Sequence, residues 1–354
     1  MKRILLFGLF LAAVFPSCKK SSVWTDEMLK EYNRYNLTVG TQTIGAIYKF
    51  TEKPILVETA ERIIAMGSNI LKISLNPAWQ ENAYNTETPE IFRHAPPSVI
   101  ASQEPAVKAM LDMDFSYILL WTATPEVDWT DGMSEKELEM EYQAIWDLAE
   151  YFRIRFKGTG KKFYIGHREG DWLLLGSFSF TQERIDTVRI QGMIDWYNIR
   201  QKAVDDAVNA TVSDTEVFQY PELKNTLFNT LDYIEKNMKA KERLKGKRVF
   251  IGEYGFPQYD YPEKQAYCSL NVMKAGIEWG CPFILYREMY DNEGRSYWMI
   301  DKNNVEQPVY KAHQTFYEEM KKYVREYIDA ERHIPDNAEF RNWEVQVLSE
   351  LRFI

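Results

Sequence analysis

The stretch VFIGEYGFP, residues 249–257, decides the fold. Its first three residues are apolar, as is typical of a buried strand, and they run directly into Glu253. Gly255 and Pro257 then turn the chain. Because a carboxylate is costly inside a sheet, we expect Glu253 to mark the point where a strand ends and a functional loop begins.

Outward from this stretch, apolar runs alternate with helical patterns along the chain. The Ser134 and Glu137 pair forms a capping box at the start of one long helix. This alternation, with nearly continuous apolar strands, predicts a parallel α/β sheet. Strands are predicted at residues 43–50, 69–75, 115–122, 162–166, 216–220, 248–252 and 282–288. Helices are predicted at residues 54–66, 101–111, 134–156, 181–209, 262–279 and 308–330.

The lengths of the connections indicate which parallel fold this is. Connections from helix to strand are short, whereas those from strand to helix are long and cover residues 76–99, 123–133, 167–180, 254–261 and 289–307. In a (β/α)8 barrel of the TIM type, the latter loops form the active-site face, so this barrel is the predicted fold. The alternative is a doubly wound sheet, but the chain lacks a glycine-rich phosphate turn after the first strand.

The middle of the chain departs from a regular barrel. A complete barrel needs a fifth and a sixth strand between Gly170 and Lys247. Only the weak candidate 216–220 is found there, and Pro221 follows it directly. We therefore expect the barrel to be irregular or gapped around strands five and six.

The composition limits the classes of function. A chain of 354 residues that is 45% hydrophobic has ample material for a large core. A net charge of −9 and the lack of a basic stripe argue against binding to nucleic acid. Four scattered histidines without an HExxH or CxxC motif argue against a metal site, and no cofactor is predicted. Cys268 and Cys281 are expected to be buried thiols, with a disulfide as the alternative.

The first residues have the pattern of a secretory signal. A basic start precedes an apolar run over residues 4–15 that is too short to span a bilayer. Ser17 and Cys18 then resemble the bacterial lipoprotein box, which implies that Cys18 is lipidated and anchors the protein to a membrane of the bacterial envelope, expected to be the outer membrane. Ordinary secretion is the alternative. The predicted divisions are a signal peptide, a tether with a leading helix, the barrel and a C-terminal tail, at residues 1–18, 19–39, 40–335 and 336–354.

A second carboxylate follows an earlier strand. The segment FYIGHREGDW, residues 163–172, places Glu169 just beyond the predicted strand 162–166. Because the carboxyl ends of barrel strands face one pocket, we expect Glu169 and Glu253 to share it. Two carboxylates are the minimum set for cleaving a glycosidic bond, since one protonates the leaving oxygen and the other attacks or stabilises the anomeric carbon.

These residues resemble the glycoside hydrolases of the (β/α)8 superfamily that carry catalytic glutamates after strands four and seven. The segment Glu253-Tyr254-Gly255 is similar to the strand-seven motif of that superfamily, which implies that Glu253 is the nucleophile. Glu169 corresponds by position to the strand-four acid/base, although Arg168 stands where the superfamily has asparagine.

The candidate substrate-binding residues follow the same strands. The resemblance implies a sugar-binding aromatic side chain at the end of strand eight, where Tyr286 precedes Arg287. A guanidinium forks onto a carboxylate or sulfate, so Arg168 is a candidate for binding a negatively charged sugar. Aromatic side chains at strand ends are either platforms for sugar rings or packing residues. The candidates are Arg168, Asp171, Trp172, Trp121, Tyr254, Tyr286, Arg287 and Glu288.

Other interpretations of the two glutamates stay open. Glu253 is alternatively a structural carboxylate that pairs with Arg168 or Arg287 in the barrel mouth. The rivals of Glu169 as the acid are Asp171, Glu126 and Glu288. The sequence thus predicts a retaining glycoside hydrolase that acts on an oligosaccharide or polysaccharide, and the alternative is a catalytically inactive glycan-binding barrel lipoprotein.

Overall fold

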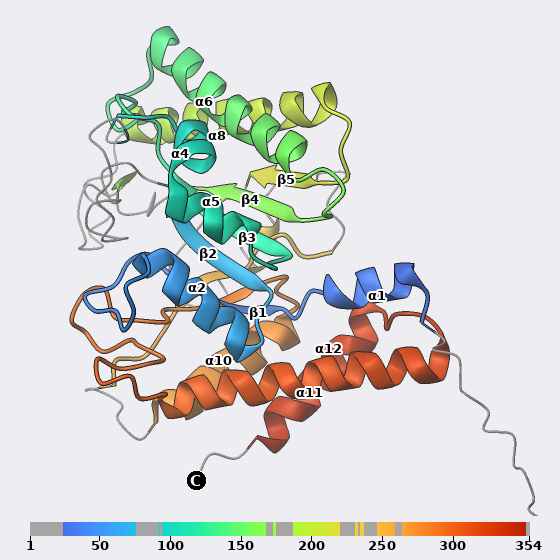
Figure 1. Cartoon of the computed structure of the whole chain (residues 1–354). Coiled ribbons are helices and arrows are strands. Elements are labelled where there is room, and N and C mark those ends of the chain that lie inside the picture. Colours follow the sequence, from blue (N-terminus) through green and yellow to red (C-terminus); the bar gives the residue numbers. More distant parts are fainter. Residues whose placement is uncertain are drawn as a thin grey trace, which may run out of the picture.

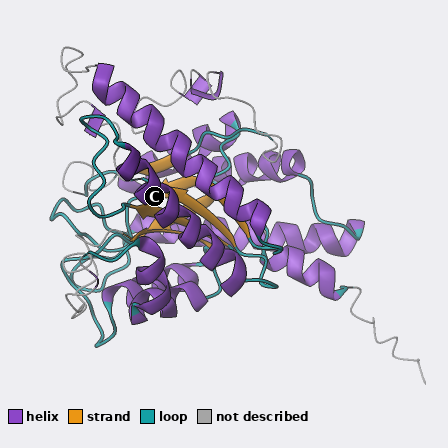
Figure 2. Ribbon diagram, turned by 90° about the horizontal axis from the view of Figure 1, so that it is seen from above, coloured by secondary structure: helices purple, strands orange, loops and turns teal. Residues whose placement is uncertain are grey.

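Seven parallel strands form one curled sheet at the centre of the protein. The structure is a computed structural model and describes residues 24–75, 92, 94–167, 173–174, 187–219, 231–232, 234–236, 246–258 and 264–351. Figure 2 shows the strands in the middle with helices around them. The strands lie in the order β5-β4-β3-β2-β1-β7-β6. They are β1 (Val39–Gln42), β2 (Ile70–Leu75), β3 (Tyr117–Thr122), β4 (Lys162–Gly166), β5 (Glu216–Gln219), β6 (Ile251–Tyr254) and β7 (Ile284–Tyr286).

The helices lie outside the sheet and connect its strands (Figure 1). Helices α6 and α8 pack against each other beside β5, whereas α10, α11 and α12 form a second group beyond β7. The predicted capping box of Ser134 and Glu137 opens α6. None of the described helices is both long enough and apolar enough to cross a membrane. The helices are α1 (Asp26–Asn33), α2 (Ile55–Met66), α4 (Pro97–Gln103), α5 (Pro105–Asp112), α6 (Glu135–Arg155), α8 (Thr187–Ala210), α10 (Gln265–Trp279), α11 (Pro308–Glu331) and α12 (Asn337–Glu350).

Aromatic contacts across the interior show that the sheet curls. Phe283, directly before β7, meets Tyr117 of β3 and Tyr164 of β4 with ring centroids 5.6 and 4.9 Å apart. In the sheet, β3, β2 and β1 all lie between β4 and β7. At about 4.8 Å per strand, a flat sheet would separate β4 from β7 by roughly 19 Å. The contacts therefore require the strands to close around a common axis.

Burial on both faces explains the continuous apolar sequences of the strands. On β3, Leu119 points into the barrel and packs with Ile70, Tyr117, Phe283 and Leu285. Its neighbours Ile118 and Leu120 belong to the larger core between the sheet and the helices. Because successive side chains of a strand point to opposite faces, a strand that is covered on both faces is apolar at every position.

The predicted TIM-type barrel is confirmed, with a seam in its wall. β5 and β6 are the two edges of the sheet, and no pairing joins them within the described residues. The connecting chain, residues 220–250, is described at only some of its positions. The seam lies in the region where the sequence predicts an irregular or gapped barrel.

The first strand begins earlier than predicted. β1 covers Val39–Gln42 instead of residues 43–50, and the barrel therefore starts one residue before the expected position 40. Gly45 interrupts the extended run because its φ of 130° lies outside the range of a strand. Ile47 instead donates its backbone N–H to Asp291 in the loop after β7, at 2.9 Å. Tyr48 and Phe50 of this segment pack against Tyr290 of the same loop.

Two further boundaries differ from the prediction for local reasons. The expected helix 101–111 consists of two helices, because Pro105 opens α5 and disfavours a helical backbone at Glu104 before it. β6 begins at Ile251 and extends to Tyr254, so Glu253 lies within the strand instead of just after it.

The two cysteines of the described residues are free thiols. Cys281 is buried, and burial raises the pKa of its thiol to about 12. Cys268 lies on α10 and is partly exposed. The prediction of thiols is confirmed, and burial is complete only for Cys281.

The C-terminal segment contains a helix where a tail was expected. Asp336 caps α12 by accepting the backbone N–H groups of Ala338 and Glu339 at 2.8 and 2.9 Å. Phe340 and Val347 are buried in the main core, which attaches α12 to the barrel. Because the helix supplies core residues, it is part of the folded domain.

Helix α12 also brings a carboxyl group into the core. Glu344 is fully buried. Burial raises the pKa of its carboxyl to about 8, although the charge of Arg341 opposes the change. The folded protein holds this proton at neutral pH, whereas the unfolded chain releases it near pH 4.5. The contribution of Glu344 to the free energy of unfolding therefore falls as the pH rises from about 4.5 to about 8.

We expect the Glu344→Gln variant to melt several degrees above the wild type at pH 8 and close to it at pH 4.5, because glutamine carries no proton to lose. A gain on the order of a few kcal/mol corresponds to roughly 4–10 °C for a chain of this size. Thermal unfolding followed by circular dichroism across pH 4–8 measures this. The exposed Glu326→Gln on α11 is the control, and a Glu344→Gln curve parallel to the wild type at every pH would contradict the prediction.

Candidate active site

Three side chains at the carboxyl ends of neighbouring strands meet at the barrel mouth. Glu253 lies near the end of β6, Gln42 is the last residue of β1, and Arg287 follows directly after β7. β7 lies between β1 and β6 in the sheet, so the three strand ends are adjacent. The Glu253 side chain is only 6% exposed. This end of the barrel is the face on which TIM-type enzymes carry their active sites.

Two donors share one oxygen of the Glu253 carboxylate. Gln42 Nε2 donates to Oε1 at 3.1 Å, and Arg287 Nη1 lies 3.3 Å from the same oxygen. A guanidinium and an amide N–H at these distances favour the ionised form of a carboxylate. The contact that the sequence predicts as an alternative, Glu253 with Arg287, is therefore present. It leaves the carboxylate with the negative charge that a nucleophile requires.

A buried lysine supports the backbone next to Glu253. Lys72 of β2 is fully buried inside the barrel, and its Nζ donates to the carbonyl oxygen of Gly252 at 2.9 Å. The same ammonium lies 3.8 Å from the ring centroid of Trp121, a cation–π contact. Trp121 is itself 3% exposed. Trp121 therefore lies beneath the mouth. Lys72 covers the face of the ring that was predicted to stack on a sugar.

Glu288 places a second carboxyl group behind the mouth. It is fully buried, and burial raises the pKa of its carboxyl well above the usual range, although the charge of Arg287 opposes this. The backbone N–H of Asn292 donates to its Oε1 at 3.1 Å, and the Arg287–Glu288 peptide bond is cis. Unlike environments for two neighbouring carboxyl groups are typical of acid–base sites. Its complete burial, however, separates Glu288 from any substrate, which corrects its expected role as a substrate-binding residue.

Tyr254 and Tyr286 pack on the outer side of the strands. The Tyr286 side chain is fully buried, and its ring meets that of Tyr254 edge to face with centroids 5.3 Å apart. The hydroxyl of Tyr254 lies 3.3 Å from Nε2 of His313 on α11. Because neighbours on a strand alternate between faces, Tyr254 points away from the mouth into which Glu253 points. Both tyrosines thus belong to the sheet–helix layer and do not line a sugar-binding floor.

Several candidate residues lie outside the described residues. They are Arg168, Glu169, Asp171, Trp172 and Cys18. The predicted pair of Glu169 and Glu253 therefore has one described member. Glu126, a rival acid, is exposed in the loop after β3.

A buried ion pair fixes the end of β4, just before the candidate Glu169. Arg200 of α8 is fully enclosed, and its Nη1 lies 2.5 Å from Glu141 Oε1 of α6. Its Nη2 donates to Thr122 Oγ1 and to the Gly166 carbonyl at 2.6 and 2.7 Å, which are the last residues of β3 and β4. One side chain thus joins two helices to two strand ends.

His167 follows this anchored strand end. It is fully buried, its ring meets that of Trp196 with centroids 5.3 Å apart, and its Nε2 contacts the hydroxyl of Tyr197. The chain therefore leaves β4 through a rigid, aromatic environment.

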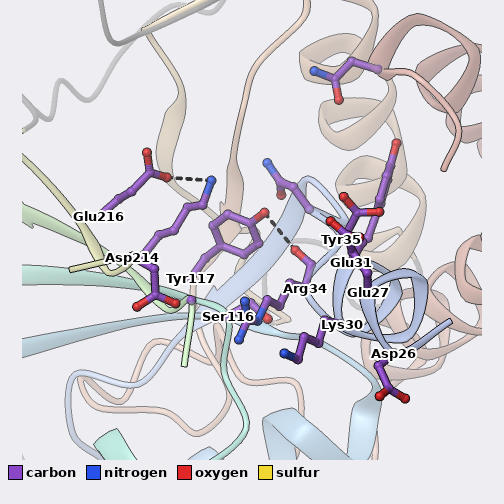
Figure 3. A pocket seen from close by; sticks show the side chains of 14 residues that line it. Asp26, Glu27, Lys30, Glu31, Arg34, Tyr35, Ser116, Tyr117, Asp214 and Glu216 are labelled. Carbon is purple, nitrogen blue, oxygen red and sulfur yellow. Dashed lines mark hydrogen bonds and ion pairs between the residues drawn. The ribbon is translucent and has the colours of Figure 1, made fainter. Parts of the chain in front are cut away.

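The opposite end of the barrel carries a hollow of about 840 Å³ beneath α1 (Figure 3). Lys162 and Glu216, the first residues of β4 and β5, form an ion pair of 2.8 Å on its wall. The hydroxyl of Tyr117 donates to the Arg34 carbonyl at 2.9 Å and holds α1 against the sheet. Residues at this end of a TIM-type barrel serve stability rather than catalysis, so the candidate site stays at the mouth with Glu253.

Some residues of the mouth are not among the predicted site residues. Gln42 lies before the predicted first strand, so its place at a strand end was hidden. Lys72 carried a usable signal, because it is a charge within the apolar strand NILKISL. Among the described residues, no three His, Cys, Asp or Glu side chains come together as a metal site would require.

Comparisons with known proteins do not assign a family to this chain. No protein-family model and no curated protein sequence matches the chain. It is similar to a solved structure described as a GH5-4 broad specificity endoglucanase from Clostridum cellulovorans, with 13% sequence identity and a TM-score of 0.45. That likeness covers 80% of this chain and 94% of the other. A likeness at this level assigns no role to any residue of the present chain.

We expect the Arg200→Leu variant to lose about 3–5 kcal/mol of unfolding free energy, because Glu141 is then left as an unpaired buried charge. Replacing both residues with leucine removes that charge and should recover at least half of the loss. Urea unfolding measures both values. The control is Lys202→Ala, which breaks an exposed pair with Asp206 and should cost less than about 1 kcal/mol. A single-variant loss no larger than the control would show that the pair contributes little.

Proposed function

We propose that this protein is a retaining glycoside hydrolase and that Glu253 is its nucleophile. The observation that supports this most is the position of Glu253: a carboxylate at the carboxyl end of a barrel strand, with Gln42 and Arg287 both in contact with its Oε1. Donors that orient the carboxylate toward the barrel mouth favour its attack on an anomeric carbon.

The remaining roles follow from the same mechanism. Glu169, the candidate beyond β4, acts as the acid that protonates the leaving oxygen and then as the base that activates water. A retaining mechanism requires its carboxyl group about 5–5.5 Å from that of Glu253. The substrate is an oligosaccharide or polysaccharide, and the reaction needs no cofactor.

One observation favours the alternative function, a glycan-binding barrel without catalysis. The Glu253 side chain is 6% exposed, and Arg287 covers it. A carboxylate enclosed in an ion pair is often structural, because removal of either partner leaves a buried charge. In this case the mouth would bind sugars, and Glu253 would hold three strand ends together.

The Glu253→Gln variant separates the two functions. We expect hydrolysis to fall by at least about a thousandfold, since glutamine keeps the shape but cannot attack the anomeric carbon. Release of reducing sugar from a panel of polysaccharides measures this, and thermal unfolding confirms that the variant folds. Glu126→Gln is the control for a rival acid and should keep its rate within about twofold. Equal rates for Glu253→Gln and the wild type would exclude the catalytic role, and sugar binding without hydrolysis by the wild type would support the alternative.

The proposed location is the bacterial envelope, through a lipid on Cys18. The support is the segment at the N-terminus, in which a basic start, a short apolar run and Ser17 precede this cysteine. Lipidation would place the barrel at a membrane surface with α1 as its first helix. A polymeric or surface-bound glycan then becomes the natural substrate.

In a bacterial host, we expect the wild-type chain to incorporate radiolabelled palmitate and to sediment with membranes. The Cys18→Ser variant should lose both properties, because the thioether-linked lipid has no attachment point. Cys268→Ser, which changes a cysteine of α10, is the matched control. Processing of the wild type without any label would indicate ordinary secretion instead.

A further inference from the structure

The Glu293 carboxylate lies between two guanidinium groups at the edge of the mouth. Its Oε1 pairs with Arg287 Nη2, and its Oε2 lies 3.7 Å from Arg295 Nε. Arg287 is mostly covered, with 16% of its side chain exposed, whereas Glu293 and Arg295 are 41% and 70% exposed. The position that this carboxylate fills is therefore open to solvent on one side and lined by two cations on the other. Such an arrangement suits an anion from outside the protein.

Arg287 uses only part of its donor set. Its Nη1 is directed at Glu253, and its Nη2 is shared by Glu293 and Asn292 Oδ1, the latter at 3.4 Å. Its Nε is buried and has no hydrogen-bond partner within the part of the chain that the structure describes. The Nε–Nη2 edge of a guanidinium binds both oxygens of one carboxylate or sulfate. Since a buried donor without a partner is costly, a ligand that reaches both nitrogens fits this edge better than Glu293 does.

The backbone of this loop is held in place independently of the Glu293 side chain. Asp291 is fully buried, and its carboxylate accepts the backbone N–H groups of Glu293, Gly294, Arg295 and Ser296 at 3.0–3.4 Å. Gly294 and Ser296 have positive φ angles of 71° and 64°, which complete the tight turn. The backbone that carries Glu293 and Arg295 is thus fixed, and only the Glu293 side chain has to turn away to admit a ligand. Binding to such a preorganised loop costs little ordering.

We propose that the space between Arg287 and Arg295 binds an anionic group of the substrate, the carboxylate or sulfate of an acidic sugar, and that Glu293 holds this position in the structure described above. The inference rests on the proposed function, in which the mouth binds a glycan, and it names the class of glycan. In this arrangement, Arg287 contacts Glu253 through Nη1 and the anion through Nε and Nη2. The charged group of the sugar thereby sits next to the carboxylate that faces the anomeric carbon.

Equilibrium binding to the full chain tests this without any need for hydrolysis. Isothermal titration calorimetry with D-glucuronate and D-glucose compares two sugars that differ in the charged group, and glucose 6-sulfate separates sulfate from carboxylate. We expect Glu293→Gln to bind glucuronate or glucose 6-sulfate about tenfold more tightly than the wild type, since a competing contact of roughly 1.4 kcal/mol is removed. Glucose affinity should stay within about twofold. Glu61→Gln, which breaks the exposed pair with Lys53, is the matched control.

A second variant keeps the test independent of the Glu253 contacts. In the Glu293→Gln background, the exposed Arg295→Gln change should weaken anion binding about threefold without affecting folding. The proposal is overturned if Glu293→Gln gains no more than Glu61→Gln, if glucose gains as much as the anionic sugars, or if the Glu293→Gln variant binds neither anion measurably. Anion binding of the expected pattern, together with no hydrolysis by the wild type, would retain this site and exclude the hydrolase. The reverse pattern would retain the hydrolase with a neutral substrate.

Discussion

The hydrogen bond from Lys72 to the Gly252 carbonyl spans the barrel interior, and the position of Glu253 depends on it. The bond joins β2 to β6, which lie on opposite sides of the curl, and it holds the peptide that directly precedes the carboxylate. Trp121 lies under the ammonium and shields it from water. A buried ammonium is tolerated only where carbonyl oxygens and ring faces replace water. The contact therefore fixes the position of β6, the strand at one edge of the seam.

Above this bond, the carboxyl groups at the barrel mouth lie in different environments. Glu253 has two donors on one oxygen, whereas Glu288 is fully buried, and burial raises the pKa of its carboxyl. Arg287 contacts Glu253 with Nη1 and Glu293 with Nη2. A ligand that replaces Glu293 at Nη2 therefore acts on Glu253 through the same planar guanidinium.

The fold could be predicted because β2, β3, β4 and β7 are largely apolar and because the long loops follow strands. Hydrophobic periodicity predicted the first strand at residues 43–50, because TIGAIYKF is mostly apolar. In the structure, Gly45 bends this segment into a loop. The sequence predicted Arg168 or Arg287 as an alternative structural partner of Glu253, and the structure shows the contact with Arg287. The motif around Glu253 could not show that Tyr254 and Tyr286 face the helices, or that Gln42 completes the site, because both depend on register and curl. Glu344 was equally hidden, since a lone carboxyl on an amphipathic helix is ordinarily solvated.

The order of the strands also affects how the protein folds during its synthesis. β1, formed by residues 39–42, is paired on one side with β2 and on the other with β7, residues 284–286. On a growing chain, β1 therefore has one edge uncovered until most of the polypeptide has been made, and contacts so distant in sequence form slowly. Gln42 and Arg287 can come together at the mouth only after β7 has been made. The mouth of the barrel can be assembled only after the last strand arrives, so a truncated product would retain its early helices and strands but never carry a finished site.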